Sequence, residues 1–315
     1  MIIVNIKGGI GNQLYQYALA RRIEMNNPYP VKIDIRSYGN YIFPHKFRLN
    51  TFNTHYEIAS EENVNSVIGK TVNLKNYHTL PLYKNFGIVS KALRYLYRKM
   101  DQLSYHYKSY LEEKQFTIDK RIPNVHDNTY LDGYWSKYAY FTDIRDVLIE
   151  EISLKDEYKT PKYRAVKDDI ERKNAVSIHI RRGYAKRKVD ENVFGVLPLS
   201  YYQRAVELIK KKVDNPFFYI FSDDSEWAQN NLHLEGNSEF INFGAEGDYL
   251  ELLLMSKCKH NIIANSTFSW WAAWLNQYSD KLVIAPQTWY RARKYQRFYE
   301  LGYKIPREWV RIPNG

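Results

Sequence analysis

The chain has 315 residues, of which 44% are hydrophobic and 26% charged, the composition of a globular protein long enough for two ordinary domains. Its net charge of +11 predicts an anionic partner, which could be a nucleic acid, a sugar nucleotide or a membrane carrying lipid-linked glycan. The single cysteine excludes an intrachain disulfide, there is no Cys/His cluster with zinc spacing, and no apolar run reaches the roughly 18 residues of a membrane span.

The N-terminus predicts a strand at residues 1–7, a glycine turn and a helix at 12–24, and it lacks the order of a signal peptide. The turn resembles a dinucleotide fingerprint, but Leu14 occupies the third glycine position, which disfavours NAD binding. Two interpretations remain. Either the backbone N–H groups from Gly9 to Asn12 meet a polar ligand at the helix N-terminus, or the segment is only a tight turn.

Residues 88–100 carry apolar side chains at helical spacing with lysines and arginines between them. Such a helix could lie on an anionic membrane or bind a carrier of the acceptor. We favour a third interpretation, in which its apolar face covers a sheet and its basic side chains stay in solvent. A strand at 129–135 ends in Tyr134 and Trp135, whose rings either stack on a sugar or belong to the core. The charged segment 155–167 predicts a domain boundary, so we expect domains at 1–158 and 159–315.

The second half opens with a buried strand at 175–180 that ends in Arg181, Arg182 and Gly183. Ligands of open α/β sheets bind at the carboxyl ends of the strands, and two guanidinium groups suit a diphosphate. Alternatively, both arginines pair with carboxylates at the strand end. Strand alternation places His179 on the face of Arg181, where it could act as a base, contact a ribose or donate a structural hydrogen bond.

Two further strands end in polar residues. Strand 217–221 is followed by Asp223 and Asp224, which either bind a ligand or cap the next helix, through Asp224 or Ser225. Strand 261–264 is followed by Ser266 and Thr267, whose hydroxyls and backbone N–H groups could hold a phosphate or form a plain helix cap. The helices expected in this half cover residues 200–212, with Ser200 as N-cap, 249–257 and 268–276, and the tryptophans of the last helix are expected in the core.

Three ordered motifs together resemble one known family. They are Gly8-Gly9-Ile10-Gly11-Asn12-Gln13, Ile178-His179-Ile180-Arg181-Arg182-Gly183 and Asn265-Ser266-Thr267-Phe268-Ser269-Trp270-Trp271. The chain resembles glycosyltransferase family 11, the α-1,2-fucosyltransferases, over nearly its whole length. The resemblance implies an α/β, GT-B-like fold in which two Rossmann-like domains face each other across a cleft. It implies that domain 1–158 meets the acceptor and that domain 159–315 binds a GDP-sugar.

The implied reaction transfers L-fucose from GDP-fucose to the 2-hydroxyl of a galactoside in a glycan, with inversion. No Asp-x-Asp motif is evident, so we expect no metal ion. Arg181 and Arg182 then supply the positive charge that stabilises the departing diphosphate. His179 is expected to act as a base or to contact the ribose. A carboxylate can accept both the N1–H and the amino group of guanine, the role we give to Asp223, as related enzymes suggest. The remaining ligand-binding candidates are Gly9, Gly11, Asn12 and Gln13 in the first domain and Ser266, Thr267 and Phe268 in the second.

One departure from the family pattern concerns a carboxylate. The family has Arg-Arg-Gly-Asp-Tyr, whereas here Tyr184 follows Gly183 directly. If that aspartate acts as a base or orients the acceptor, then Asp190 or Glu191 must substitute, the mechanism must tolerate no base, or the acceptor must differ.

Other functions remain as alternatives. The protein could be a related transferase that uses another nucleotide sugar or acceptor. It could also be a catalytically silent protein that binds sugar or nucleic acid. Its basic residues are scattered along the sequence, which disfavours nucleic acid. A glycosidase is least favoured because it needs two facing carboxylates. We expect a cytoplasmic enzyme of polysaccharide or O-antigen biosynthesis, with peripheral contact at the inner face of the membrane as a further expectation. The sequence does not predict an oligomeric state.

Overall fold

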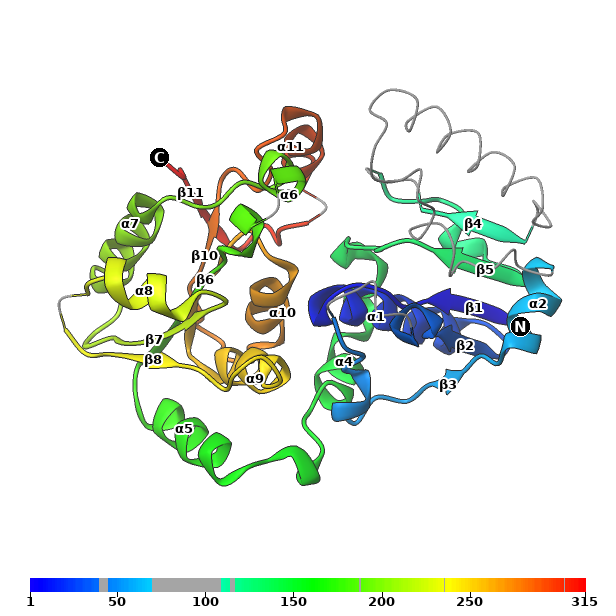
Figure 1. Ribbon diagram of the computed structural model, residues 1–315, viewed down its shortest axis with the longest axis horizontal. Helices are drawn as coiled ribbons and strands as arrows, with labels where there is room; N and C mark the ends of the chain where they lie inside the picture. Colours follow the sequence, from blue (N-terminus) through cyan, green and yellow to red (C-terminus); the bar gives the residue numbers. More distant parts are fainter. Residues whose placement is uncertain (40–44, 70–108, 114–116, 187, 235, 303) are drawn as a thin grey trace. The chain divides into compact units, whose positions relative to one another are not determined.

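The computed structural model describes the chain except residues 40–44, 70–108, 114–116, 187, 235 and 303, which are grey in Figure 1. Contacts divide the chain into two compact units. The first unit contains residues 1–47 and 55–135, and the second contains residues 48–54 and 136–315. Each unit has its own parallel sheet with helices packed on it, which confirms the α/β fold with two parallel-sheet units. The expected helix at 88–100 lies outside the described residues.

The first unit is built on a five-stranded sheet with the order β3-β2-β1-β5-β4, and all its described pairings are parallel. Its elements are β1 (Ile2–Asn5), α1 (Ile10–Asn26), β2 (Val31–Asp34), β3 (Glu57–Ile58), α2 (Glu61–Ile68), β4 (Tyr110–Glu112) and β5 (Thr129–Asp132). Ser60 and Asn63 form a capping box at the start of α2. The helix then buries Val64 against Ile3 and Tyr130 of the sheet.

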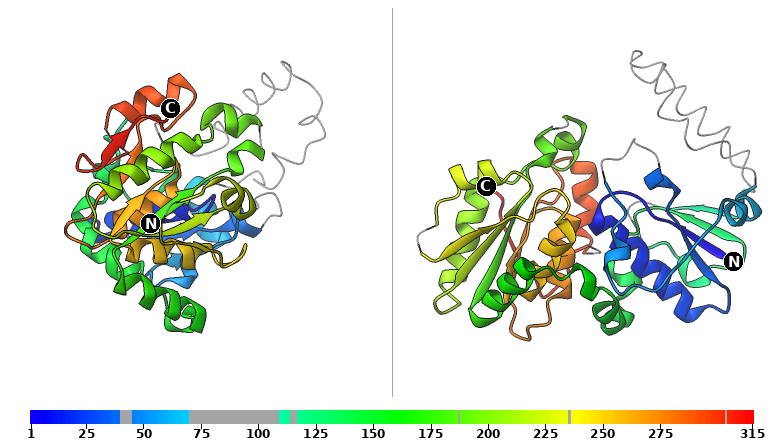
Figure 2. Two further views of the ribbon diagram at one scale, coloured as in Figure 1. Left: turned by 90° about the vertical axis from the view of Figure 1, so that its left-hand side faces the viewer. Right: turned by 60° about the horizontal axis from the view of Figure 1, so that its bottom comes forward.

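The second unit is built on a six-stranded parallel sheet with the order β11-β10-β9-β6-β7-β8. Its strands are β6 (Ala175–Ile180), β7 (Phe217–Ser222), β8 (Ser238–Ile241), β9 (His260–Ile262), β10 (Val283–Pro286) and β11 (Val310–Ile312). Its helices are α4 (Arg145–Glu151), α5 (Pro161–Arg172), α6 (Lys188–Val193), α7 (Leu199–Lys210), α8 (Ser225–Asn231), α9 (Asp248–Lys257), α10 (Thr267–Leu275) and α11 (Arg293–Glu300). Helices α7 and α8 cover one face of the sheet, and α9 and α10 cover the other (Figures 1 and 2).

Strand β6 lies at the centre of the second sheet, and all six of its residues are buried. The chain continues from β6 to β7 and β8 on one side and then returns to β9 on the other side. The strand order therefore reverses between β6 and β9. In open α/β sheets this reversal is the place where ligands bind, because the connections after the two strands turn away from each other.

The division into units differs from the expected boundary between residues 158 and 159. The segment 136–158 belongs to the second unit, where the ring of Phe141 stacks on Trp271 with centroids 5.3 Å apart and Arg145 donates to the carbonyl of Trp274. The segment 155–167, in which the boundary was expected, contains the start of helix α5 at Pro161. Pro161 occupies the first helical position, which has no intrahelical N–H bond to lose.

Two smaller expectations have clear outcomes. Helix α7 begins with Pro198 as its N-cap residue, so Ser200 lies inside the helix and the expected Ser200 cap is wrong. Trp270, Trp271 and Trp274 are buried, which confirms their place in the core. Among the described helices, none is both long enough and apolar enough to cross a bilayer.

Candidate functional site

The polar residues that follow β6, β7 and β9 meet at the carboxyl edge of the second sheet. Arg181–Gly183 follow β6, Asp223–Asp224 follow the end of β7, and Asn265–Thr267 follow β9. We call these three segments together the carboxyl edge. The tertiary structure thus places three separate predicted segments around the point where strand order reverses, and the bonds between them determine what the edge can bind.

Asp223 organises the loop after β6. Its Oδ1 accepts a hydrogen bond from the backbone N–H of Arg182 at 2.7 Å, and its Oδ2 accepts one from the N–H of Gly183 at 2.8 Å. The guanidinium of Arg181 lies 2.9 Å from the same Oδ2. Both carboxylate oxygens are therefore used within the chain. The guanine-binding role that we predicted for Asp223 stays a prediction, and it requires the carboxylate to exchange at least one of these partners.

Gly183 allows this close approach of Asp223. A Cβ atom at position 183 would lie 2.5 Å from Oδ2 of Asp223, closer than side-chain carbons occur in proteins. Any other residue at 183 would push the carboxylate away from the loop. The glycine of the Arg-Arg-Gly motif is thus required for space next to a carboxylate, a reason that the sequence did not indicate.

Arg182 is held by different partners. Its guanidinium carbon lies 3.7 Å from the ring centroid of Trp227, and its Nε lies 3.8 Å from Oδ2 of Asp224. Asp224 accepts a hydrogen bond from the N–H of Trp227 and is the N-cap of α8, which confirms it as the cap of that helix. The stacked ring restricts the guanidinium to one orientation, as cation–π contacts do.

The loop after β9 is fixed by a buried amide. Nδ2 of Asn265 donates to the carbonyl oxygens of Phe194, Gly195 and Trp289 at 3.0 to 3.2 Å. Ser266 is the N-cap of α10, and its Oγ accepts from the N–H of Phe268 at 3.3 Å. The helix-cap interpretation of Ser266 is therefore confirmed. Phosphate binding by Ser266, Thr267 and Phe268 stays a prediction.

His179 is buried beneath the carboxyl edge, with 4% of its surface exposed. Its ring lies 5.1 Å from that of Phe268, and Nδ1 has no hydrogen-bond partner among the described residues. Burial lowers the pKa of His179 to about 3, an effect that Asp223 opposes and Arg181 reinforces. The imidazole is neutral at physiological pH. This pKa favours a hydrogen-bond contact over general-base catalysis, for which a pKa near the working pH is best.

The lowered pKa of His179 has a measurable effect on stability. A histidine in the unfolded chain titrates at about 6.5, so between about pH 6.5 and 3 the unfolded state binds more protons than the folded state. The stabilisation is fully present above pH 6.5 and is lost as the pH falls, by up to about 1.4 kcal/mol per pH unit. We expect the free energy of unfolding of the wild type to fall more steeply from pH 6.5 to about pH 5 than that of His179→Gln, in denaturant titrations. Equal slopes would contradict the burial effect.

The first unit holds its own candidate residues where β1 leads into α1. Gly8 has a φ of +83°, and its carbonyl accepts from Nε2 of Gln13 at 3.0 Å and from the hydroxyl of Tyr38 at 2.8 Å. Nε2 of Gln13 also donates to the carbonyl of Lys46, and the side chain is wholly buried. Gln13 therefore holds the turn together. Of the four predicted contacts here, Gly9 and Asn12 are partly exposed, while Gly11 is buried.

An ion pair joins the ends of β1 and β5, where the strand order of the first sheet reverses. Nζ of Lys7 lies 2.5 Å from Oδ1 of Asp132 and 5.3 Å from the ring centroid of Tyr134. Burial acts to raise the pKa of Asp132, but Lys7, together with hydrogen bonds from Tyr110 and Asn5, lowers it overall. Tyr134 is exposed, as a sugar-stacking ring must be, whereas Trp135 is fully buried and belongs to the core.

Comparison with known protein families identifies one that covers nearly the whole chain. The model of glycosyl transferase family 11 matches residues 1–313. The chain belongs to this family. It is therefore a glycosyltransferase, which confirms the resemblance drawn from the three motifs.

Curated relatives of this family 11 protein come from bacteria and mammals. The Escherichia coli O-antigen biosynthesis glycosyltransferase WbnK is 30% identical over 297 residues, covering 90% of this chain and 93% of that protein. An Escherichia coli α-1,2-colitosyltransferase is 30% identical over 322 residues and 99% of both chains. Mouse galactoside α-(1,2)-fucosyltransferase 2 is 24% identical over 69% of this chain and 62% of that protein. The crystal structure of fucosyltransferase NodZ from Bradyrhizobium is similar with a TM-score of 0.48 at 14% identity, over 86% of this chain and 91% of that one.

The two carboxylates considered as replacements for the family aspartate lie on α6. Glu191 is paired with Arg291, whose Nη1 lies 3.2 Å from Oε1 of Glu191. The C-terminal end of α6 is tied to the carboxyl edge, because Asn265 donates to the carbonyls of Phe194 and Gly195. Asp190 is partly buried on the same helix. Whether Asp190 or Glu191 acts on the acceptor stays a prediction.

Sequence reasoning missed three parts of the site, namely the bridging bonds of Asp223, the stacking of Arg182 on Trp227 and the anchoring role of Asn265. Each joins residues that are far apart in the chain, so no spacing pattern could have indicated them. Within the described part of the chain, no three His, Cys, Asp or Glu side chains cluster as metal ligands would.

Proposed function

We propose that this family 11 protein transfers L-fucose from GDP-fucose to the 2-hydroxyl of a galactoside in a glycan, with inversion and without a metal ion. The observation that carries the proposal is the carboxyl edge, where Arg181 is fixed by Asp223 and Arg182 by Trp227. Two oriented guanidinium groups at the strand-order reversal suit a diphosphate leaving group. The proteins named above as similar include a colitosyltransferase, a fucosyltransferase and an O-antigen biosynthesis glycosyltransferase, which supports sugar transfer of this kind.

The proposed reaction breaks the bond between fucose C1 and the β-phosphate oxygen while the acceptor 2-hydroxyl oxygen forms a new bond on the opposite face of C1. The departing GDP gains negative charge, and Arg181 and Arg182 stabilise that charge. The N-terminus of α10, with the N–H groups near Ser266 and Thr267, adds a positive dipole end. The hydroxyl proton passes to a carboxylate on α6 or to solvent. Gly9 and Asn12 are assigned to the acceptor side together with exposed Tyr134.

The fixed arginines are pre-oriented before the donor arrives. Arg181 is only partly exposed, and its partner Asp223 is itself held by two backbone N–H groups, so the guanidinium loses little freedom on binding. Preorganised charges of this kind act mainly on the transition state, because the leaving group becomes more negative as the bond breaks. His179, neutral and with an unpartnered Nδ1, is proposed to contact the ribose or a phosphate oxygen.

A second donor is favoured by one specific observation, the α-1,2-colitosyltransferase that matches 99% of this chain. Colitose is fucose without its 3-hydroxyl. A site that hydrogen-bonds a hydroxyl rejects the analogue that lacks it by about 10⁴-fold or more, whereas a site that tolerates a hydroxyl discriminates by only about 100-fold. The ratio of fucosylated to colitosylated product, when GDP-fucose and GDP-colitose compete in one reaction, therefore identifies the preferred donor.

The first test measures thermal stability with GDP, UDP, ADP and NAD, each in the presence of EDTA. We expect GDP to raise the melting temperature most, because ligand that binds only the folded state stabilises it. Transfer of fucose to lactose, compared with hydrolysis of GDP-fucose when lactose is absent, then distinguishes an enzyme from a catalytically silent binder. Stabilisation by NAD alone, or transfer that stops with EDTA and returns with magnesium, would overturn the proposal. Binding of single-stranded RNA or DNA is not expected.

A further inference from the structure

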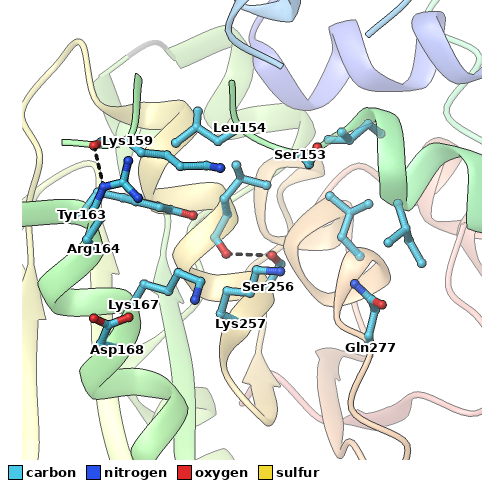
Figure 3. Close-up of a pocket in the computed structure, with 14 residues that line it drawn as sticks. Ser153, Leu154, Lys159, Tyr163, Arg164, Lys167, Asp168, Ser256, Lys257 and Gln277 are labelled. Atoms are coloured by element: carbon cyan, nitrogen blue, oxygen red, sulfur yellow. Dashed lines mark hydrogen bonds between the residues drawn. The ribbon is translucent and has the colours of Figure 1, made fainter. Parts of the chain in front are cut away.

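The second unit contains a cavity of about 380 Å³ that shares no residue with the carboxyl edge (Figure 3). It lies between the segment around Ser153, the N-terminal half of α5, and the C-terminal ends of α9 and α10. The apolar side chains of Ile152, Leu253 and Leu275 form part of its wall. Its size is that of a small-molecule site, because such pockets commonly measure about 300 to 1,000 Å³.

Four cations line this cavity, against the single lining carboxylate of Asp168. They are Lys159, Arg164, Lys167 and Lys257. Such a concentration of one charge in a concave site attracts anions.

The two paired cations in this group have exposed partners. Nζ of Lys159 lies 2.5 Å from Asp156, and Nζ of Lys167 lies 2.7 Å from Glu171. The side chain of Asp156 is 89% exposed and that of Glu171 is 47% exposed. Exposed ion pairs contribute at most about 1 kcal/mol, so these lysines can exchange their partners for a ligand at little cost.

The other two cations have no carboxylate partner. In the described part of the chain, no acidic side chain lies within ion-pair distance of Lys257 or Arg164, and Nε of Arg164 donates to the carbonyl of Lys159. The pKa of Lys257 is lowered, mainly by loss of solvent; Glu171 opposes this shift, and repulsion from Lys167 and Lys159 adds to it. An anion in the cavity would relieve this repulsion.

Tyr163 adds a neutral hydrogen-bond donor to the four cations. Its side chain is 3% exposed, and the residue lines the cavity. Figure 3 shows that the hydroxyl points into the space between the lysines. A tyrosine hydroxyl facing a cavity can donate a hydrogen bond to an anion inside it.

We propose that this cavity binds a small phosphomonoester, with the phosphate held by Lys257, Arg164 and the hydroxyl of Tyr163. A phosphate has the charge and the acceptor oxygens that this group lacks. The hydroxyl of Ser153 and the amide of Gln277 line the same cavity and can bind the hydroxyls of a compact organic body such as a sugar. The size of the cavity excludes a polymer as the occupant. This binding does not depend on the identity of the donor sugar.

The test is isothermal titration of the full chain with inorganic phosphate, glucose 1-phosphate and glucose, with and without saturating GDP. We expect glucose 1-phosphate to bind more tightly than phosphate, glucose not to bind, and GDP not to compete. Lys257→Gln and Tyr163→Phe should each weaken binding about tenfold, because each removes one contact to a charged group. Lys212→Gln is the matched control, since Lys212 is an exposed lysine at the end of α7 and does not line the cavity.

Several results would overturn this assignment. They are no binding of either phosphate compound, equal affinities in the wild type and both cavity variants, or displacement of glucose 1-phosphate by GDP. Binding of inorganic phosphate alone would overturn the assignment to an ester. Melting temperatures of the variants are measured in parallel, and Tyr163→Phe removes a single oxygen, so its effect on binding can be separated from misfolding. If GDP fails to bind, the titrations without GDP still decide this proposal.

Discussion

Arg181→Ala is expected to lower kcat for fucose transfer by about 100- to 1,000-fold, because it removes a preoriented donor to the departing diphosphate. The fold around the site should survive. Asp223 keeps its hydrogen bonds to the N–H groups of Arg182 and Gly183, so the loop after β6 stays attached. The measurement is steady-state transfer from GDP-fucose to lactose, together with the melting temperature with and without GDP.

Two further variants separate charge from geometry at this position. Arg181→Lys keeps the positive charge but loses the planar fork, so its activity should lie between those of the wild type and the alanine variant. Arg172→Ala is the matched control, because Arg172 is 70% exposed at the end of α5, and its loss should change kcat by no more than about twofold. Full activity of Arg181→Ala would contradict the assignment of this residue to the leaving group.

Gly183→Ala is expected to reduce kcat/KM by roughly 100-fold, because it displaces Asp223 from two of its three partners. The added Cβ would lie 2.5 Å from Oδ2, the oxygen that bonds both the N–H of Gly183 and the guanidinium of Arg181. Arg181 would then lose its fixed orientation although it is still present. Donor titrations and transfer rates of the variant measure the effect.

A double variant tests whether this effect acts through the carboxylate. In Asp223→Ala the oxygen that would clash is absent, so adding Gly183→Ala should cost little more activity. Non-additivity of this kind is expected only for residues in contact. If the two substitutions multiply their effects on kcat/KM, then Gly183 acts by another route, for instance through the flexibility of the loop, and the contact argument is wrong.

Local patterns were enough to predict much of the second unit. Strand β6 was predicted at 175–180, and the strands that became β7 and β9 were predicted with small shifts, because buried parallel strands are short apolar runs with polar ends. Helix α5 was missed. Its sequence is rich in charge and begins with Pro161, which was interpreted as a sign of a domain boundary but is favourable at the first helical position.

Unit boundaries were harder to predict, because they depend on packing partners. Residues 136–158 belong with the second unit through contacts such as that of Phe141 with Trp271, 130 positions away. The short strands β8 and β11 and the helix α11 were also missed. They have little apolar periodicity of their own and are held by pairing or packing with elements distant in the sequence.

The sequence by itself determined the family, the reaction class and the residue types at the carboxyl edge, because each motif is contiguous and its chemistry depends on which side chains it contains. Only the tertiary structure decided how these side chains are used. Asp223 bonds Arg181 and the loop of Gly183 some 40 residues away, and Lys257 is gathered with α5 around a separate cavity. Hydrogen bonds and charge act over a few ångströms in space, and distance along the chain does not record which groups become neighbours.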